Sequence, residues 1–372
     1  GLKVGIEVHQ QLATSRKLFC ECPCTLRSDE PDFTIIRRLR PTQSELGEVD
    51  PAAEFEFKKG RTIVYEAYKD TTCLVELDEE PPHQPDQEAI DIALTFAQMI
   101  GATPVDELYV LRKTVVDGSN PSGFQRSIIV ALGGEIKLPS RKTIPIQTIC
   151  VEEDAARKIK EEGMKIWYRV DRLGIPLIEV ATAPVISSPK EAEEAALAIG
   201  RLLRATKRVR RGLGTVRQDV NISIRDGALI EVKGVQRLDL VSKVVEYEVR
   251  RQLELLKIRD ELRERGVKEE DIAEDFVDVT DVFAKTESRV IKSALKRGGV
   301  VLAVKLPGFA GLLGRELMHG VRLGTEMSDR ARFWGRVGGI FHTDELPGYG
   351  ITEEEVRKLR EAVGAREEDA VV

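Results

Sequence analysis

The stretch TVRQDVNISI (residues 215–224) decides the fold of the first part of the chain, because polar and apolar side chains alternate along it. Successive side chains of a β-strand point to opposite faces of a sheet, so the pattern predicts a strand with one wet and one dry face. From Val220 onward the even-numbered positions are apolar. The polar positions are Thr215, Arg217, Asp219, Asn221 and Ser223.

Three other segments predict strands with chemical groups on one side. They are LKVGIEVHQQL (residues 2–12), PLIEVA (176–181) and ALIEVKGV (228–235). The first places Glu7 and His9 opposite apolar residues, and the third does the same with Glu231 and Lys233. Glu179 stands inside the otherwise apolar second segment. A carboxylate there is costly to bury unless it is paired or binds a metal ion, so we treat these strands as the candidate site.

Helical spacing of apolar residues predicts four helices. Ser188, with Pro189 at the first helical position and Glu191 closing a capping box, starts one of them. Thr352 and Glu355 start the last, and Gly364 ends it. The composition changes near residue 280, where glycine becomes frequent, and this indicates a domain boundary. Three ranges are 86–101, about 239–264 and 352–364, and the helix that starts at Ser188 has an apolar face that runs to Leu203.

Length and composition exclude several classes of protein. The 372 residues are 42% hydrophobic and 32% charged, which is typical of a globular protein of two or three domains. No stretch approaches the roughly 20 apolar residues of a membrane span, and the start lacks the features of a signal peptide. We therefore expect a cytoplasmic protein. The net charge of −6 excludes a uniformly basic surface, so any RNA contact would use local patches.

The predicted strands, together with the acidic pair Glu152 and Glu153, would line one cavity with carboxylates, an imidazole, an arginine and a lysine. Carboxylate oxygens suit Mg²⁺, and nearby cations suit a transferring phosphoryl group, so phosphoryl transfer is one interpretation. The other interpretation is that these are ordinary strands with one solvated face and one buried face. Neither a P-loop nor a GxGxxG motif follows a predicted strand, so ATP would bind in another way.

Two weaker sequence features, a basic run and a cysteine motif, each allow more than one interpretation. The basic run at the end of the helix that starts at Ser188 suits either a phosphate patch or a solvated helix end. It comprises Arg201, Arg204, Lys207, Arg208, Arg210 and Arg211. Cys20, Cys22 and Cys24 would supply three zinc ligands, with a fourth from Cys73, Cys150 or a distant histidine.

Six ordered motifs resemble the catalytic subunits of glutamyl-tRNA(Gln) amidotransferases and span nearly all of residues 1 to about 280. The motifs are GIEVHQQL, KLFCECPC, VEEDAARK, DRLGIPLIEVATAPVISSPKEA, GTVRQDVNIS and EVKGVQRLDLVSKVVEYEVRRQ. The loop RKTVVDGSNPSGFQRS is more similar to the archaeal branch, the E subunits, than to the B subunits of the three-subunit enzyme. The second cysteine pair of many B subunits has no counterpart here, which argues against structural zinc.

The resemblance implies an α+β fold. Residues 1–284 would form a glutamine synthetase-like cradle with a mainly antiparallel sheet. Residues 285–372 resemble the small α+β insertion domain of bacterial-type aspartyl-tRNA synthetases. In the family the chain continues into helical and tail domains that hold tRNA, so we expect this sequence to be part of a longer chain.

The implied activity is ATP- and Mg²⁺-dependent phosphorylation of the γ-carboxylate of Glu-tRNA(Gln), followed by amide formation with ammonia from an asparaginase-like partner, the D subunit. A hetero-oligomer is expected. Alternatives are the B subunit of the three-subunit enzyme, a non-catalytic tRNA-binding scaffold, and a metal-dependent amide hydrolase that needs no ATP.

The motifs also assign roles to residues. His9, Glu153 and Glu179 would hold the catalytic Mg²⁺, with Glu7 and Asp219 nearby for a second ion or its water shell. The remaining predicted site residues would face the nucleotide or the acyl phosphate, and they are Lys113, Asn120, Arg217, Asn221 and Lys233.

Overall fold

The computed structural model describes residues 1–41, 43, 46–335 and 337–372. The described residues divide into two compact units. The first comprises Gly1–Ser223 and Leu229–Val245, and the second Ile224–Ala228 and Glu246–Val372. The helix α4 (Leu238–Glu264) contributes residues to both. The domain boundary expected at residue 284 stays a prediction.

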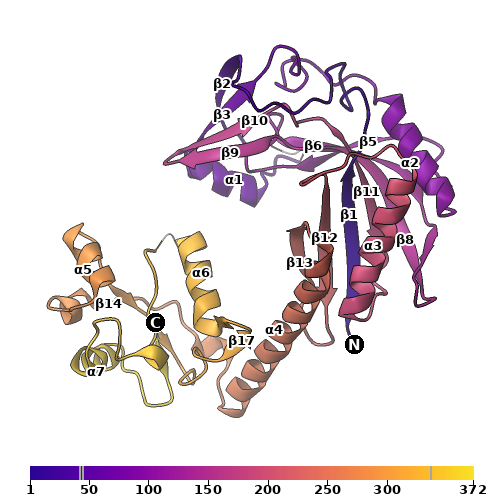
Figure 1. Cartoon of the computed structure of the whole chain (residues 1–372). Coiled ribbons are helices and arrows are strands. Elements are labelled where there is room, and N and C mark those ends of the chain that lie inside the picture. Colours follow the sequence, from indigo (N-terminus) through magenta and orange to yellow (C-terminus); the bar gives the residue numbers. More distant parts are fainter. Residues whose placement is uncertain (42, 44–45, 336) are drawn as a thin grey trace. The chain divides into compact units, whose positions relative to one another are not determined.

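A large antiparallel sheet dominates the first unit (Figure 1). Within the described part of the chain its order is β13-β12-β1-β11-β8-β6-β4, with β5 on β6 and β7 on β8, and every pairing is antiparallel. The mainly antiparallel sheet expected from the sequence is confirmed. The strands are β1 (Lys3–Gln11), β4 (Thr103–Pro104), β5 (Val110–Thr114), β6 (Phe124–Leu132), β7 (Glu135–Lys137), β8 (Thr143–Glu153), β11 (Pro176–Thr182), β12 (Val216–Ser223) and β13 (Ile230–Val235).

Two helices cover one face of this sheet. Val4, Ile6 and Val8 are fully buried on that side of β1, which α3 (Pro189–Ala205) contacts, while α2 (Gln87–Met99) contacts β6 and β8. Figure 1 shows both helices beside these strands. Each buried valine or isoleucine contributes roughly 1.5–3 kcal/mol to folding. The hydrophobic effect therefore fixes the orientation of β1 and leaves its polar side on the other face.

Local signals define the helix starts. The Ser188 side chain accepts a hydrogen bond from the Glu191 N–H, and Pro189 occupies the first turn, as expected. The Glu191 carboxylate, however, accepts from the Ser187 N–H at 2.9 Å, so the box closes one residue earlier than predicted. Asp86 caps α2 by accepting from the Ala89 N–H.

A smaller sheet packs around its own core in the first unit, and its order is β2-β3-β10-β9. The pair β3–β10 is parallel and the others are antiparallel. Its buried cluster includes Ile63, Tyr65, Ile166 and Tyr168. The elements of this part are β2 (Phe33–Arg38), α1 (Pro51–Lys58), β3 (Thr62–Ala67), β9 (Arg157–Glu162) and β10 (Lys165–Arg169).

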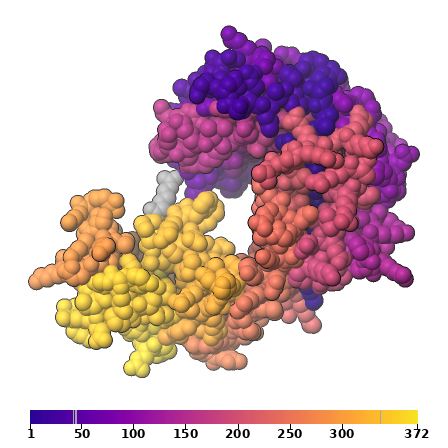
Figure 2. Space-filling model, in the orientation of Figure 1, coloured from indigo at the N-terminus to yellow at the C-terminus, as the bar shows by residue number. Residues whose placement is uncertain are grey.

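The second unit mixes helices with short strand pairs around separate apolar clusters. One cluster holds Phe283, Ile291, Leu359 and Val371, and the later part of α4 packs Ile258 against Leu312 and Leu317. Figure 2 shows the described residues of this unit from about 280 to the C-terminus, coloured orange to yellow, packed together. Its elements are β14 (Val277–Asp278), α5 (Arg289–Lys296), β15 (Leu302–Ala303), β16 (Lys305–Leu306), β17 (Glu316–Met318), β18 (Val321–Arg322), α6 (Leu323–Gly335), α7 (Glu353–Ala362) and β19 (Ala370–Val371), with 3₁₀ turns at Glu269–Asp271, Thr280–Phe283 and Thr343–Glu345.

The start of α7 confirms the capping box predicted there. The Thr352 side chain accepts from the Glu355 N–H, while the Glu355 carboxylate accepts from the Thr352 N–H. Gly364 follows the helix with φ +60°, a conformation that glycine adopts without strain. Among the described residues, no helix is both long enough and apolar enough to cross a membrane.

Candidate active site on the open face of the large sheet

Three adjacent strands bring the predicted polar side chains to one face. His9 on β1 lies directly opposite Glu179 on β11 and Arg217 on β12, and Glu7 lies opposite Asp219. Residues directly opposite each other in an antiparallel pair share a face, so these five side chains project together from the sheet. They lie on the side away from the buried Val4, Ile6 and Val8.

Glu7, His9, Glu152 and Glu179 form what we call the histidine–carboxylate cluster. The His9 Nε2 atom lies 3.1 Å from Glu179 Oε2 and 3.9 Å from Glu152 Oε2. Glu7, His9 and Glu179 each offer one ligand atom, and these atoms lie within 4.8 Å of one another. Glu152 and Glu179 are buried and His9 and Glu7 are partly buried, so three carboxyl groups share a region with little solvent.

The cluster concentrates negative charge. Burial raises the pKa of Glu7, and the charge of Glu179 adds to the effect. Burial likewise raises the pKa of Glu152, with Glu179 adding to it and Lys113 opposing it. Burial lowers the pKa of His9, but the hydrogen bond and charge of Glu179 outweigh it and raise the value overall. The arrangement favours any cation that approaches the open face.

Lys113 on β5 brings a positive charge into contact with the two buried carboxylates. Its Nζ atom donates hydrogen bonds to Glu152 and to Glu179, the latter at 3.3 Å. Burial lowers the pKa of Lys113, but the charges and hydrogen bonds of Glu152 and Glu179 together outweigh it and raise the pKa overall. The side chain is 49% exposed, so its ammonium group is accessible to a ligand as well as to the two carboxylates.

A second acidic group adjoins the first along β12 and β13. Glu7, Asp219 and Glu231 offer ligand atoms within 4.8 Å of one another. Lys233 Nζ lies 2.7 Å from Glu231 and 3.6 Å from Asp219. Asn221 donates from Nδ2 to Glu7 at 3.1 Å. Glu231 was not among the predicted ligands, although the alternation of residues 229–233 already placed it beside Lys233.

Glu153 is not part of either group. Neighbouring residues of a strand point to opposite faces, and Glu153 pairs with Arg126, whose Nη1 lies 3.2 Å from both carboxylate oxygens. Glu152 is the member of the acidic pair that lies beside His9, and the metal-ligand role assigned to Glu153 stays a prediction. Burial raises the pKa of Glu153, against the opposing effect of Arg126.

A buried network holds Arg217 in place. Its Nη2 donates to Asp154 Oδ1 at 3.3 Å, and the other oxygen of Asp154 accepts from Gln11 at 2.7 Å. Asp154 is fully buried, and Arg172 lies 3.7 Å from it. Sequence reasoning missed Asp154, although it stands directly after the acidic pair in VEEDAARK.

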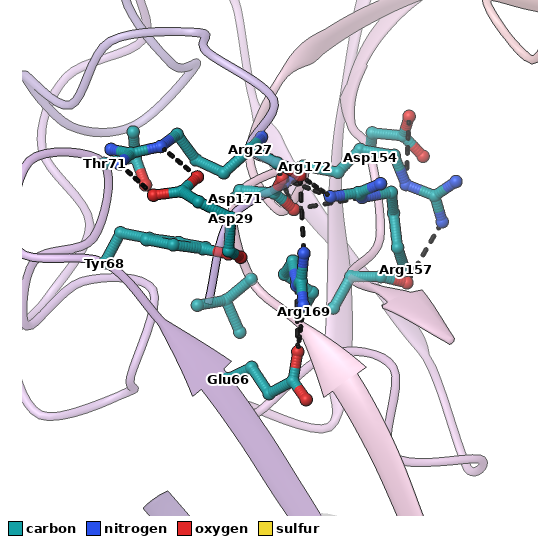
Figure 3. Close-up of polar contacts among 12 residues, drawn as sticks. Arg27, Asp29, Glu66, Tyr68, Thr71, Asp154, Arg157, Arg169, Asp171 and Arg172 are labelled. Atoms are coloured by element: carbon teal, nitrogen blue, oxygen red, sulfur yellow. Dashed lines mark hydrogen bonds and ion pairs between the residues drawn. The ribbon is translucent and has the colours of Figure 1, made fainter. Parts of the chain in front are cut away.

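Asp171 organises the arginines behind this network (Figure 3). It is fully buried and accepts hydrogen bonds from Arg157 Nε at 3.1 Å and from the backbone N–H groups of Arg27 and Arg172 at 2.7 and 2.8 Å. Arg172 Nε in turn donates to the Ala155 carbonyl at 2.7 Å. These bonds fix the turn after β8 and therefore the position of the adjacent Asp154.

Asn120 lies in the loop between β5 and β6, where the sequence predicted a nucleotide contact. It is 2% exposed, and its Nδ2 atom has no hydrogen-bond partner among the described residues. It lines a groove of about 1140 Å³ that also exposes Arg38, Arg40 and Arg112. A buried amide donor without a partner is rare and suggests a ligand or ordered water.

The basic run at the end of α3 is only partly available as a phosphate patch. Arg208 pairs with Glu88 at 3.2 Å, and Arg210 donates to the Cys24 carbonyl.

The three cysteines of the C-x-C-x-C motif do not face a common point. Cys24 Sγ contacts the Thr14 hydroxyl at 3.6 Å, whereas Cys20 and Cys22 face Glu76.

Comparison with known proteins matches residues 2–355 to the family described as the GatB/GatE catalytic domain. The chain belongs to the GatB/GatE catalytic domain family. A 61% identical relative from Aeropyrum pernix aligns with 98% of this chain and 56% of its own length. Relatives from Methanocaldococcus jannaschii and Pyrococcus furiosus are 60% and 58% identical over 100% of this chain and 59% and 58% of their own lengths.

All three of these relatives are named as the E subunit of glutamyl-tRNA(Gln) amidotransferase. The resemblance to the archaeal branch of the GatB/GatE family is thereby confirmed, and the B subunit is not favoured. The chain spans a little over half the length of these relatives.

Proposed function

We propose that this chain carries the phosphorylation and amide-forming site of an ATP-dependent glutamyl-tRNA(Gln) amidotransferase. The observation that carries the proposal is the histidine–carboxylate cluster with Lys113 on the open face of the sheet. Phosphoryl transfer needs groups that bind divalent cations beside groups that neutralise phosphate, and this face provides both within a few ångströms.

The donor set fits a divalent cation. Carboxylate oxygens are the ligands that Mg²⁺ prefers, and such sites commonly use carboxylates plus substrate phosphates. We assign Glu7, His9, Glu152 and Glu179 to one ion, with Glu152 in place of Glu153, and Glu7, Asp219 and Glu231 to a second. When bound, Mg²⁺ would withdraw charge from the phosphate oxygens.

The cationic side chains have complementary tasks. Lys113, Arg217 and Lys233 neutralise the phosphate charge that would otherwise repel the approaching glutamate carboxylate. Arg217 is held by Asp154, so little of its freedom remains to be lost on binding. Asn120 donates its unpaired Nδ2 hydrogens to the nucleotide, and Asn221 keeps Glu7 in place.

The chemistry has two balanced steps. A γ-carboxylate oxygen of the glutamate attached to tRNA attacks the γ-phosphorus of ATP, the bond to the β-phosphate oxygen breaks, and ADP leaves. Ammonia then attacks the carbonyl carbon of the acyl phosphate, inorganic phosphate leaves with the C–O bonding electrons, and the nitrogen loses a proton. Burial around Glu152 and Glu179 limits the water that would hydrolyse the acyl phosphate.

The proposed assembly contains more than this chain. The relatives' names describe one subunit of an enzyme that acts on tRNA. We assign ammonia release to an asparaginase-like D subunit and the acceptor to Glu-tRNA(Gln), in a hetero-oligomer. Residues 1–284 form the proposed catalytic cradle and residues 285–372 the proposed aspartyl-tRNA synthetase-like insertion.

The test is Mg²⁺-dependent phosphate release from ATP by the complete complex. Glu-tRNA(Gln) should stimulate it, whereas free glutamate should not. Glu179→Ala should reduce this turnover by more than about 100-fold, because even residues that only orient metal ligands typically contribute 10–100-fold. Glu135→Ala, an exposed carboxylate on β7 of the same sheet, is the matched control.

Normal turnover in Glu179→Ala would contradict the metal assignment. Amide hydrolysis without ATP would favour the hydrolase interpretation, and tRNA binding without ATP cleavage in the complete complex would favour a scaffold.

A further inference from the structure

Three thiols and a carboxylate converge in a group that shares no residue with the histidine–carboxylate cluster. Cys20, Cys22, Cys73 and Glu76, here called the thiol cluster, each offer one ligand atom, and these atoms lie within 4.8 Å of one another. Glu76 carboxylate oxygens lie 3.4 Å from Cys20 Sγ, 3.8 Å from Cys22 Sγ and 2.9 Å from Cys73 Sγ. The four residues come from two loops, one after β1 and one after β3.

The spacing suits a small tetrahedral ion. With Zn–S bonds of about 2.3 Å, two sulfur ligands of a tetrahedral zinc lie about 3.8 Å apart, and oxygen and sulfur ligands lie slightly closer. The thiol cluster is therefore within about 1 Å of the required separations before any side chain moves. Thiolates with one carboxylate also match the ligand types that zinc accepts, whereas Mg²⁺ prefers an all-oxygen environment.

The surroundings supply a compensating charge. Lys17 Nζ lies 2.7 Å from Glu76 Oε1 and also donates to the carbonyls of Thr71 and Val170 at 2.7 and 3.2 Å. Lys17 is 1% exposed and Glu76 is 6% exposed. Three thiolates, one carboxylate and Zn²⁺ sum to −2, which the Lys17 ammonium reduces to −1. Without a metal ion, three thiols crowd around a carboxylate that already accepts from Lys17 and from the Cys73 N–H.

We propose that Cys20, Cys22, Cys73 and Glu76 bind a structural zinc ion. Cys24 is excluded, because its thiol faces Thr14. Binding releases the three thiol protons and leaves no position open for substrate, as is usual at structural zinc sites. The ion joins two loops separated by about fifty residues and so fixes the exit of β1, the strand that carries Glu7 and His9. The proposal does not rest on the proposed function.

The test measures metal in the untagged protein purified with reduced thiols from zinc-supplemented medium. About one zinc per chain is expected by mass spectrometry. Cys73→Ser and Glu76→Gln should lower the content by at least fivefold, while the matched control Cys24→Ser should retain it. Circular dichroism and gel filtration establish that each variant is folded.

If a variant does not fold, the unaltered protein still decides the question. Replacement of zinc by Co²⁺ should give the thiolate-to-cobalt absorption band and the visible bands of a tetrahedral ion. Folded, reduced protein without zinc would overturn the proposal. Retention of zinc in folded Cys73→Ser, or its equal loss in Cys24→Ser, would overturn the ligand set.

Discussion

The histidine–carboxylate cluster and the thiol cluster are both candidate metal sites, but their surroundings differ. The first projects from three neighbouring strands, offers mostly oxygen ligands, and is contacted by the half-exposed Lys113. The second lies in two loops, offers mostly sulfur, and adjoins the buried Lys17. Catalytic sites keep a position for substrate and structural sites do not, so the contrast assigns chemistry to the sheet and stabilisation to the loops.

Removal of metal ions should have the largest effect and should affect the two clusters differently. Short dialysis against EDTA should abolish tRNA-dependent ATP cleavage by the complete complex, and Mg²⁺ alone should restore it, because a few carboxylates and waters hold Mg²⁺ less tightly than thiolates hold zinc. The zinc content should be unchanged over the same period. Activity that requires added zinc for its recovery would contradict this division of roles.

The neighbours Glu152 and Glu153 test which face of β8 belongs to the site. Glu152→Gln should reduce turnover by about 10–100-fold, because the residue contacts both His9 and Lys113. Glu153→Ala should instead lower the free energy of unfolding by about 3 kcal/mol, because Arg126 loses its buried partner. Turnover assays and urea denaturation measure the two effects. The opposite pattern would return Glu153 to the ligand set.

Lys17→Met tests the charge balance of the thiol cluster. In zinc-free protein the change leaves the Glu76 carboxylate buried without its cation, and we expect a loss of about 3–5 kcal/mol in unfolding free energy. In zinc-loaded protein the loss should be smaller, because the ion compensates Glu76. Denaturation with and without zinc gives both values. Equal losses in the two forms would argue that no ion binds beside Glu76.

Asn120→Ala should have the smallest effect. The Nδ2 atom has no partner within the described part of the chain, so the free energy of unfolding should change by less than about 1 kcal/mol. The KM for ATP should rise by about 3–10-fold, the equivalent of one hydrogen bond. Ser122→Ala in the same loop is the control. An unchanged KM would remove Asn120 from the nucleotide contacts.

Much of the secondary structure followed from local patterns. The predicted ranges 86–101, about 239–264 and 352–364 correspond to α2, α4 and α7, with ends that differ by at most two residues. The helix predicted to start at Ser188 corresponds to α3. The strand patterns correspond to β1, β11, β12 and β13. Periodicity and capping are properties of neighbouring residues, and for that reason they can be recognised without knowledge of the tertiary structure.

The site was only partly predictable, and β8 shows why. At the end of this strand Glu152 and Glu153 are both buried, so no alternation of polar and apolar residues indicates which one shares a face with His9. Asp154 and Glu76 were missed for a related reason. Each is identified by a partner distant in the sequence, such as Arg217 for the first and Cys20 for the second.

The sequence by itself determined which strands have a polar face, where the main helices begin and end, and which family the motifs resemble. The pleat of a strand and the capping of a helix depend on residues close together in the chain. Only the tertiary structure decided that His9 meets Glu179 across 170 positions, that Glu152 joins them, and that Cys73 and Glu76 complete the thiol cluster. Strand register and loop packing depend on the burial of the whole core, which no local pattern records.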